Sequence, residues 1–416
     1  FRAARLGVGA TARPGPAADT RPGQRLRAVL LVIELAGTLA LLVVAGLFAR
    51  SLWNAQHQPL GFEPRNLVSF HVGLGEGGYR GARARGLADQ ALAQTRALPG
   101  VRAASWALRI PAGDQQLSLG FRIPGYHPPS PGAWEGAYYN AVSPEYFRTM
   151  GMHLVSGRGF RPSDGPAAAR VAVVNLAFAR QYWPGRQALG QVFYLDGASG
   201  RPVRVVGVAA DARIPHPYGV VDPCLFLPLA QQPALGAAFL LVRSAMPIGT
   251  VAPEVMRLVR RLAPMAPVTG AQTMTAALNS LNGYGALRLG AGMAAGLGAL
   301  ALALALVGVY GAMAYAAARR RREVGIRLAL GAPPARVLGL LARRGLAIVG
   351  AGTAAGLLVA LAMGDLLGSM LYGISPHDPV VFAAAAGALA LAAFAACLGP
   401  ALRAVRANPL AAIRQE

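Results

Sequence analysis

The chain has 416 residues, enough for two or three domains, and 54% of them are hydrophobic against 14% charged. That balance excludes an ordinary soluble protein. All 40 basic residues are Arg, and the formal net charge of +23 at first suggests nucleic acid as a partner.

Four apolar segments are long enough to cross a lipid bilayer, which needs about 20 apolar residues. Buried helices of a soluble protein are the alternative interpretation, but such helices rarely run this long without polar residues. We therefore predict four transmembrane helices, at residues 28–49, 289–318, 345–372 and 380–402.

The distribution of Arg predicts the orientation of these helices, because basic residues stay on the cytoplasmic side. Residues 1–27, 319–344 and 403–416 hold 17 Arg and three acids in 67 residues, whereas residues 51–287 hold 21 Arg and 11 acids in 237. Both termini are therefore predicted to be cytoplasmic, and the turn 373–379 to lie outside. The cytoplasmic location of the Arg-rich segments and their attraction to anionic lipid explain the excess positive charge, so we do not expect nucleic acid as a partner. The cations expected at the membrane boundary are Arg319, Arg320, Arg321 and Arg322.

The segment between the first two helices, residues 50–287, alternates short apolar runs with helical patterns. This pattern predicts an extracytoplasmic α/β domain, with two subdomains favoured over one. Strands are expected at residues 66–74, 101–108, 170–175, 201–211, 224–230 and 237–244, and helices at 84–100, 176–185 and 251–264.

Signals of enzyme chemistry are weak. The run GLGEGG at 73–78 fits a dinucleotide-binding pattern but lacks the acidic residue after the next strand, so a flexible loop is expected. A P-loop requires a Lys, which the chain lacks, and the six His form neither a zinc motif nor a close pair. Cys224 is predicted outside the membrane and Cys397 inside a span, so no disulfide between them is expected. We expect no catalytic residue, metal site or cofactor in this chain.

Two acids, Glu34 and Asp365, lie within the first and third predicted helices. A charge in hydrocarbon is costly and is usually retained for a function. Structural residues that face the helix bundle or lie near the headgroups are the favoured interpretation, and proton-coupled transport is the alternative. Small-residue spacing also favours close helix contacts at Gly292, Gly296, Gly352 and Gly356.

The loop between the second and third helices has a pattern of its own. Apolar residues at every second position from 324 to 330 surround Arg327, which suggests a short interfacial helix with one apolar face. Gly331 ends this helix, and Pro333 with Pro334 begins a new one that leads into the third span. The residues alone leave two interpretations open: a contact for a cytoplasmic protein, or a membrane-surface helix without a partner.

The same loop, RRREVGIRLALGAPPARVLGLLARRG at 320–345, resembles the cytoplasmic loop of MacB/FtsX-type ABC transporter permeases. The resemblance covers nearly the whole chain from residue 26. One departure is Leu176, where the family often has an acid. Further motifs that resemble the family are VSPEYFRTMGMHLVSGRGF at 142–160, VAVVNLAFARQYWPG at 171–185, VVGVAADAR at 205–213, LYGISPHDP at 371–379 and GPALRAVRANPLAAIRQE at 399–416.

This resemblance implies an α-helical integral membrane protein of the bacterial inner membrane, with four transmembrane helices and a large α/β periplasmic core domain between the first two. Such permeases work as dimers or as paired halves of one duplicated chain. Residues 1–25 resemble the linker between such halves, so the chain is expected to be a C-terminal half. A separate ABC ATPase, which binds ATP and Mg, is expected on the cytoplasmic face, and an adaptor or substrate on the periplasmic side.

The function implied by the resemblance is to couple ATP hydrolysis to movement of the periplasmic domain, for export or mechanotransmission. One alternative is a non-transporting sensor or scaffold that signals through the same loop. Another is a secondary transporter that uses Glu34 and Asp365, which the lack of an inverted repeat disfavours. The residues expected to couple the chain to the ATPase are Glu323, Gly325, Ile326, Arg327, Gly331 and Ala332.

Overall fold

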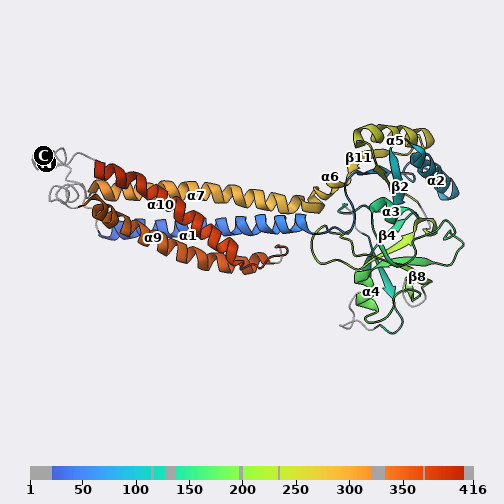
Figure 1. Cartoon of the computed structure of the whole chain (residues 1–416), viewed down its shortest axis with the longest axis horizontal. Coiled ribbons are helices and arrows are strands. Elements are labelled where there is room, and N and C mark those ends of the chain that lie inside the picture. The colour runs from blue at the N-terminus through green and yellow to red at the C-terminus, as the bar shows by residue number, and fades with distance from the viewer. Residues whose placement is uncertain are drawn as a thin grey trace, which may run out of the picture. The chain divides into compact units, whose positions relative to one another are not determined.

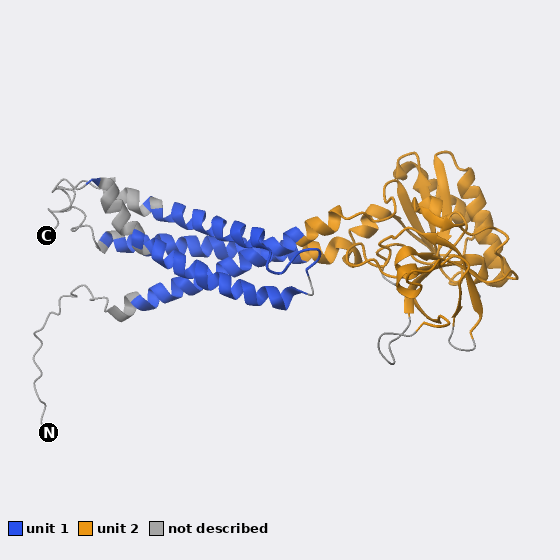
Figure 2. Ribbon diagram, turned by 60° about the horizontal axis from the view of Figure 1, so that its bottom comes forward, with its two compact units in different colours: residues 1–50, 290–416 blue, residues 51–289 orange. Residues whose placement is uncertain are grey.

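The computed structural model describes residues 21–113, 117–126, 136–195, 200–232, 235–319, 333–368 and 371–406. They form two compact units, one of residues 1–50 with 290–416 and one of residues 51–289 (Figure 2). The boundaries between the units fall inside two long helices, so both connections between them are helical.

The first unit is built from four long apolar helices (Figure 1). The stretches long and apolar enough to cross a membrane are Arg25–His57, Met274–Ala316, Gly345–Leu367 and Pro379–Cys397, and the second of them begins before the long helix that it includes. Three of the helices extend beyond the predicted apolar limits, because charged and polar residues at their ends continue the helix. The helix predicted at 345–372 begins earlier, at Pro334, but already ends at Leu367. Their bounds are α1 Arg21–His57, α7 Ala286–Arg319, α9 Pro334–Leu367 and α10 Pro379–Arg406.

The second unit begins with a four-stranded antiparallel sheet, in the order β11-β1-β10-β2. Two helices, α2 Gly81–Ala97 and α5 Ile248–Leu262, cover one face of this sheet (Figure 1). Successive side chains of a strand point to opposite faces, so apolar residues at alternate positions of β1, β10 and β2 meet the helices, together with Val268 of β11. The strands are β11 Val268–Thr273, β1 Leu67–Val72, β10 Ala238–Ser244 and β2 Val101–Ala107.

Six further strands form a closed ring, because β4 pairs with β3 on one side and with β9 on the other. The order around the ring is β4-β3-β7-β8-β6-β9, and β5 Leu154–Gly157 pairs with β8 outside it. A single pair, Ala107 with Val142, joins the ring to the four-stranded sheet. The ring strands are β4 Gly136–Val142, β3 Ser118–Arg122, β7 Val192–Leu195, β8 Pro202–Ala209, β6 Val171–Asn175 and β9 Cys224–Pro228.

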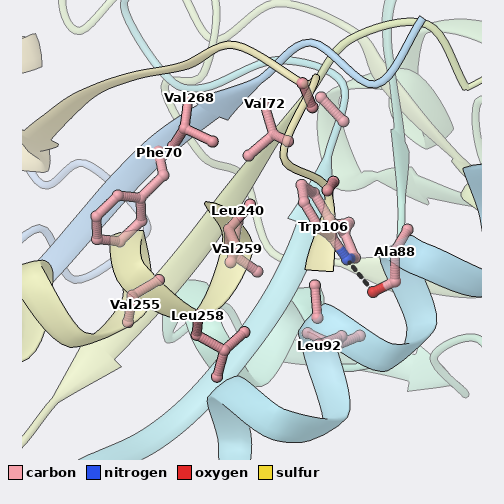
Figure 3. Packing of buried hydrophobic residues seen from close by; sticks show 14 of the residues in the cluster. Phe70, Val72, Ala88, Leu92, Trp106, Leu240, Val255, Leu258, Val259 and Val268 are labelled. Carbon is pink, nitrogen blue, oxygen red and sulfur yellow. Dashed lines mark hydrogen bonds between the residues drawn. The ribbon is translucent and has the colours of Figure 1, made fainter. Parts of the chain in front are cut away.

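Each part of the second unit has its own hydrophobic core. In the sheet, Trp106 is almost completely buried, and its indole N–H donates a hydrogen bond to the carbonyl of Ala88 at 2.9 Å (Figure 3). In the ring, Phe121, Phe178 and Phe193 pack with centroid distances of 5.1 to 6.1 Å. The short helix α4 Leu176–Tyr182 contributes Phe178 and Tyr182 to the core of the ring, and a second short helix, α3 Tyr146–Met150, has four buried residues of its own.

The glycine-rich run at 73–78 is a packed turn rather than the flexible loop expected from the sequence. The Gly75 amide donates to the Gly236 carbonyl at 2.6 Å, and the Gly73 amide donates to that of Pro267 at 3.0 Å. A Cβ at Gly77 would lie 2.7 Å from backbone atoms of Ala266. These glycines therefore allow two backbone segments to approach each other, a role that the sequence pattern alone does not distinguish from loop flexibility.

Candidate functional site

Helix α1 is the centre of the helical unit, and glycines bring α9 close to it. A Cβ at Gly352 would lie 2.6 Å from the Leu35 Cβ, and one at Gly356 would lie 2.9 Å from the Ala36 carbonyl oxygen. Both glycines lie on the face of α9 that packs on α1. The small-residue spacing expected at this pair is thus a true helix contact.

The contact between α7 and α1 uses other glycines than those expected. Nothing lies within 4 Å of a Cβ built at Gly292 or at Gly296, so the prediction for that pair is wrong. Instead, a Cβ at Gly298 would lie 3.4 Å from Leu42, and one at Gly308 would lie 3.0 Å from Leu31. These two glycines are ten positions apart, a spacing that does not match a small-residue motif.

Glu34 lies on the face of α1 that meets α7. Its carboxylate oxygen Oε2 is 2.9 Å from the position that a Cβ at Gly308 would take, and the residue is half-buried. One turn further along, the buried Thr38 hydroxyl donates to the Glu34 carbonyl at 2.8 Å and lies 3.2 Å from the Ala301 carbonyl of α7. The acid therefore lies at a helix contact, where the absence of a Cβ on Gly308 leaves room for its side chain.

The second acid, Asp365, lies near the end of α9 and is exposed. His377 Nε2 lies 3.2 Å from its Oδ1. His377 belongs to the segment that leads into α10, and its Nε2 is also 3.3 Å from the Leu361 carbonyl oxygen. Asp365 and Glu34 thus occupy separate contacts in the helical unit.

A third acid, Asp378, organises the same end of the helical unit. Its Oδ1 accepts hydrogen bonds from the amides of Val380 and Val381, at 2.9 and 3.3 Å, as a helix N-cap does. Arg50 of α1 donates to the same oxygen at 2.9 Å, and the Asp378 side chain is only 12% exposed. Sequence reasoning missed this site, although an Asp followed by Pro at the first helical position is a recognisable signal for the start of a helix.

The candidate ATPase-coupling residues, Glu323 to Ala332, lie outside the described residues, as do Arg320, Arg321 and Arg322. Arg319 is the last residue of α7. On the other side of the loop, α9 begins at Pro334, with Pro333 as its N-cap, as the Pro-Pro pair predicts. Helices α7 and α9 therefore flank this loop directly.

The segment that follows α1 is held in the second unit by Arg243 of β10. Its guanidinium donates to three backbone carbonyls, those of Thr149 at 2.7 Å, Glu63 at 2.7 Å and Arg65 at 3.0 Å. Burial is the main cause that lowers the pKa of this guanidinium. The three carbonyl oxygens accept its hydrogen bonds. The exit of α1 is thus bound to the sheet.

The segment that precedes α7 is also anchored within the second unit. It is a π-helical turn, Leu281–Gly285, in which Gly283 has a non-helical backbone. Tyr284 stacks on Tyr218 with ring centroids 6.4 Å apart. When the Gln56 amide is oriented with its oxygen toward Arg288, that oxygen accepts from Nε and Nη2 at 3.2 and 3.1 Å, which joins the end of α1 to the start of α7.

Polar groups elsewhere in the second unit support loops rather than reactive centres. Asp164 accepts from both terminal nitrogens of Arg158, at 2.7 and 3.0 Å, and from the Arg161 amide at 2.8 Å. The hydrogen bonds from Arg158 hold the pKa of the Asp164 carboxyl below its usual value. Burial raises the pKa of the Cys224 thiol, so this residue is a neutral thiol at physiological pH. Within the described residues, no group of three or more His, Cys, Asp or Glu is placed to hold a metal ion.

Four apolar helices joined by two helical connections to a large α/β unit fit a multi-pass membrane protein. The MacB-like periplasmic core domain profile matches residues 35–272, and the FtsX-like permease C-terminal profile matches residues 295–409. The first match alone covers more than half of the chain. The chain therefore belongs to the MacB/FtsX-type permease family, which confirms the resemblance.

Three solved structures are similar to about half of this chain, each at 14% sequence identity. The periplasmic region of MacB from Actinobacillus actinomycetemcomitans aligns over 53% of this chain and 96% of its own, with a TM-score of 0.36. The extracellular domain of the noncanonic ABC-type transporter YknZ from Gram-positive bacteria aligns over 49% and 100%, with a TM-score of 0.34. A domain of a putative permease from Porphyromonas gingivalis aligns over 51% and 94%, also at 0.34. No curated protein matches the chain.

Family membership gives the chain the general role of a permease subunit of an ABC transporter. It also implies an ABC ATPase as a partner in general terms. The described residues at the two helical connections are the part of the molecule through which the membrane helices and the α/β unit are covalently joined.

Proposed function

We propose that this permease transmits ATP-driven movements of its membrane helices to its periplasmic domain, for export or mechanotransmission. The ATP and Mg bind to a separate ATPase, and the chain itself uses no cofactor. The observation that carries this proposal is that both helical connections are anchored in the second unit, one through Arg243 and the other through Tyr284. Anchored helices transmit displacement, whereas flexible linkers absorb it.

The first step of the proposed mechanism is contact between the ATPase and the loop 323–332. This loop follows α7 and precedes α9, so a push on it acts on the ends of both helices. Both helices pack on α1 through glycines, with α9 at Gly352 and Gly356 and α7 at Gly298. Close backbone contact leaves little freedom for one helix to move without the others, so the displacement reaches α1 and α7 together.

The proposal places the protein in the bacterial inner membrane with both termini in the cytoplasm. It also requires either a second copy of the chain or the other half of a longer one, since closure of two ATPase subunits needs two docking loops. Support for this orientation comes from the Arg distribution. Glu34 and Asp365 take structural roles in this proposal, because each lies at a contact between segments of the helical unit.

The test uses the full chain reconstituted with its cognate ATPase. Ile326→Asp combined with Arg327→Ala should reduce the permease-stimulated ATPase rate to nearly that of the isolated ATPase. The control, Arg186→Ala, changes an exposed Arg of the second unit and should leave stimulation unchanged. Full stimulation by the double variant would contradict the coupling role of the loop. Failure of any nucleotide-binding subunit to co-purify would favour the non-transporting sensor or scaffold.

A further inference from the structure

The loop between β8 and β9, residues 210–223, is attached to both helical connections of the second unit. The Arg213 amide donates to the Leu60 carbonyl at 2.9 Å, three residues after the end of α1. Tyr218 stacks on Tyr284, two residues before the start of α7. Because α1 and α7 both contain stretches apolar enough to cross a membrane, the loop lies at the end of the second unit from which the chain enters the bilayer.

The tip of this loop exposes an apolar side chain. Val220 is 89% exposed, more than any other large hydrophobic residue that the structure describes. The surrounding residues 217–221, PYGVV, carry no charge. Gly219 has φ of +105°, which favours glycine, and its carbonyl accepts a hydrogen bond from the Arg213 guanidinium. The turn therefore holds Val220 away from the protein, where it can contact a non-polar surface.

Two further exposed apolar residues belong to the helical connections themselves. Trp53, near the end of α1, is 60% exposed, and Leu281, at the start of the π-helical turn, is 65% exposed. Both lie within the stretches that are apolar enough to cross a membrane. The Trp53 ring stacks on that of His57, with centroids 4.3 Å apart. Trp and Tyr are enriched where membrane proteins meet the headgroups, because their rings combine an apolar body with a polar group.

A lipid surface suits these residues better than a protein partner does. Trp53, Leu281 and Val220 belong to three separate segments, two of which continue into membrane spans. A stable protein interface uses about 20 to 30 residues on each side, whereas lipid adapts to a few separate side chains. The acid beside the tip, Asp222, has its Oδ2 3.5 Å from the His216 Nδ1, and its side chain is 32% exposed. The apolar tip can therefore enter the headgroup region without burying this carboxylate.

We propose that the tip of the loop, with Val220 at its end, lies in the headgroup region of the membrane that α1 and α7 enter. Trp53 and Leu281 continue the same lipid contact. The stack of Tyr218 on Tyr284 sets the position of the tip relative to the start of α7. Besides its two helical connections, the second unit thus gains a direct attachment to the bilayer surface.

The contact is testable with the full chain in nanodiscs of zwitterionic lipid, without any ATPase. The chain has two Cys, so Cys224→Ala with Cys397→Ala provides a background for Val220→Cys. Val220 is almost fully exposed, so this substitution should not affect folding. An NBD label on the Val220→Cys variant should lose at least about half of its fluorescence when the lipids carry a headgroup nitroxide, because interfacial side chains enter lipid by about 5–10 Å.

Met265→Cys in the same background is the matched control. Met265 is another exposed large hydrophobic residue, 73% exposed, and it lies just before β11. The π-helical turn follows the other end of that strand. A strand of six residues separates its two ends by about 20 Å. A label on Met265→Cys should therefore keep its fluorescence in the nitroxide lipids.

A second measurement avoids the apolar dye. In the same discs, the unlabelled Val220→Cys variant should react with a sulfonated, water-soluble thiol reagent at least about tenfold more slowly than Met265→Cys, because apolar surroundings disfavour the thiolate. Absence of quenching on Val220→Cys would overturn the proposal, and so would equal reaction rates. Slow reaction without quenching would place the tip against a second copy of the chain instead of lipid. Because no ATPase is present, failure of the coupling proposal would not change these outcomes.

Discussion

At the scale of single residues, the stabilising polar contacts of this permease gather where loops meet strands. The Arg158 and Asp164 pair is the clearest case, since the Asp164 side chain is 8% exposed and accepts three hydrogen bonds. A carboxylate in such a site is difficult to replace, because its removal leaves several donors without acceptors.

Asp164→Asn should therefore lower the stability of the ring of strands by about 1 to 3 kcal/mol at neutral pH. The folded-state pKa of Asp164 is depressed, so the stabilisation is present above the unfolded-state pKa of about 3.9 and is lost as the pH falls through the lower, folded-state value. The stabilities of wild type and variant should thus begin to converge below about pH 4.

The measurement can use Cys224, which is buried in β9 and reacts only when the ring opens. In a Cys397→Ala background, labelling by a pyridyl disulfide along a urea gradient reports the unfolding of the second unit. The control is Asp89→Asn, because burial raises the pKa of that carboxyl and its removal should not destabilise the fold. If the difference in unfolding free energy between wild type and Asp164→Asn were the same at pH 7 and pH 3.5, the ion pair would not be the cause of the destabilisation.

At the scale of helices and strands, glycine placement decides how closely α9 approaches α1. Gly356→Val should separate the two helices, because the new Cβ would lie 2.9 Å from the Ala36 carbonyl oxygen and from the Leu39 Cβ. Overpacking of this kind costs about 1 to 3 kcal/mol. Gly292→Val is the matched control, since nothing lies within 4 Å of a Cβ at that position.

Cys397 of α10 is buried in the helical unit and can report this change. In a Cys224→Ser background, thermal labelling of Cys397 in detergent should begin at a lower temperature for Gly356→Val than for wild type. Gly292→Val should match wild type. Equal midpoints for all three proteins would mean that the α1 and α9 contact contributes little to the stability of the unit.

Apolar patterning predicted the long helices and the strongly hydrophobic strands, such as β6 and β8. These segments consist mainly of apolar residues, because most of their side chains are buried. It missed β5 and β11, which are largely exposed and carry no clear alternation. It also missed β4, where Tyr and Asn interrupt the apolar run. Strand pairing, not local sequence, makes these segments extended.

The candidate site was predictable to a different degree. Gly352 and Gly356 were found because their spacing matches one helix face, whereas Gly298 and Gly308 contribute one contact each and form no short motif. Arg243 gave no signal, since the three carbonyls that its guanidinium contacts belong to segments far from β10 in the sequence. Long-range pairings of this kind are fixed by the tertiary fold.

At the scale of the whole molecule, the absence of Lys turns the predicted orientation into a direct measurement. An amine-reactive reagent can label only the chain terminus, so each introduced Lys is a single reporter. We expect Arg186→Lys, in the second unit, to react with a membrane-impermeant ester added to intact spheroplasts. Arg414→Lys should react only after lysis, because basic-rich segments remain in the cytoplasm.

The two variants test a single physical cause. Each Arg-rich segment disfavours its own transfer across the membrane, and the three such segments in this chain all require the same orientation for four spans. Because all three Arg-rich segments favour the same orientation, the other two should maintain it when one loses its charge. Replacing Arg319, Arg320, Arg321 and Arg322 by Gln should therefore leave the labelling of both Lys variants unchanged. Labelling of Arg414→Lys in intact spheroplasts, without labelling of Arg186→Lys, would contradict the proposed orientation.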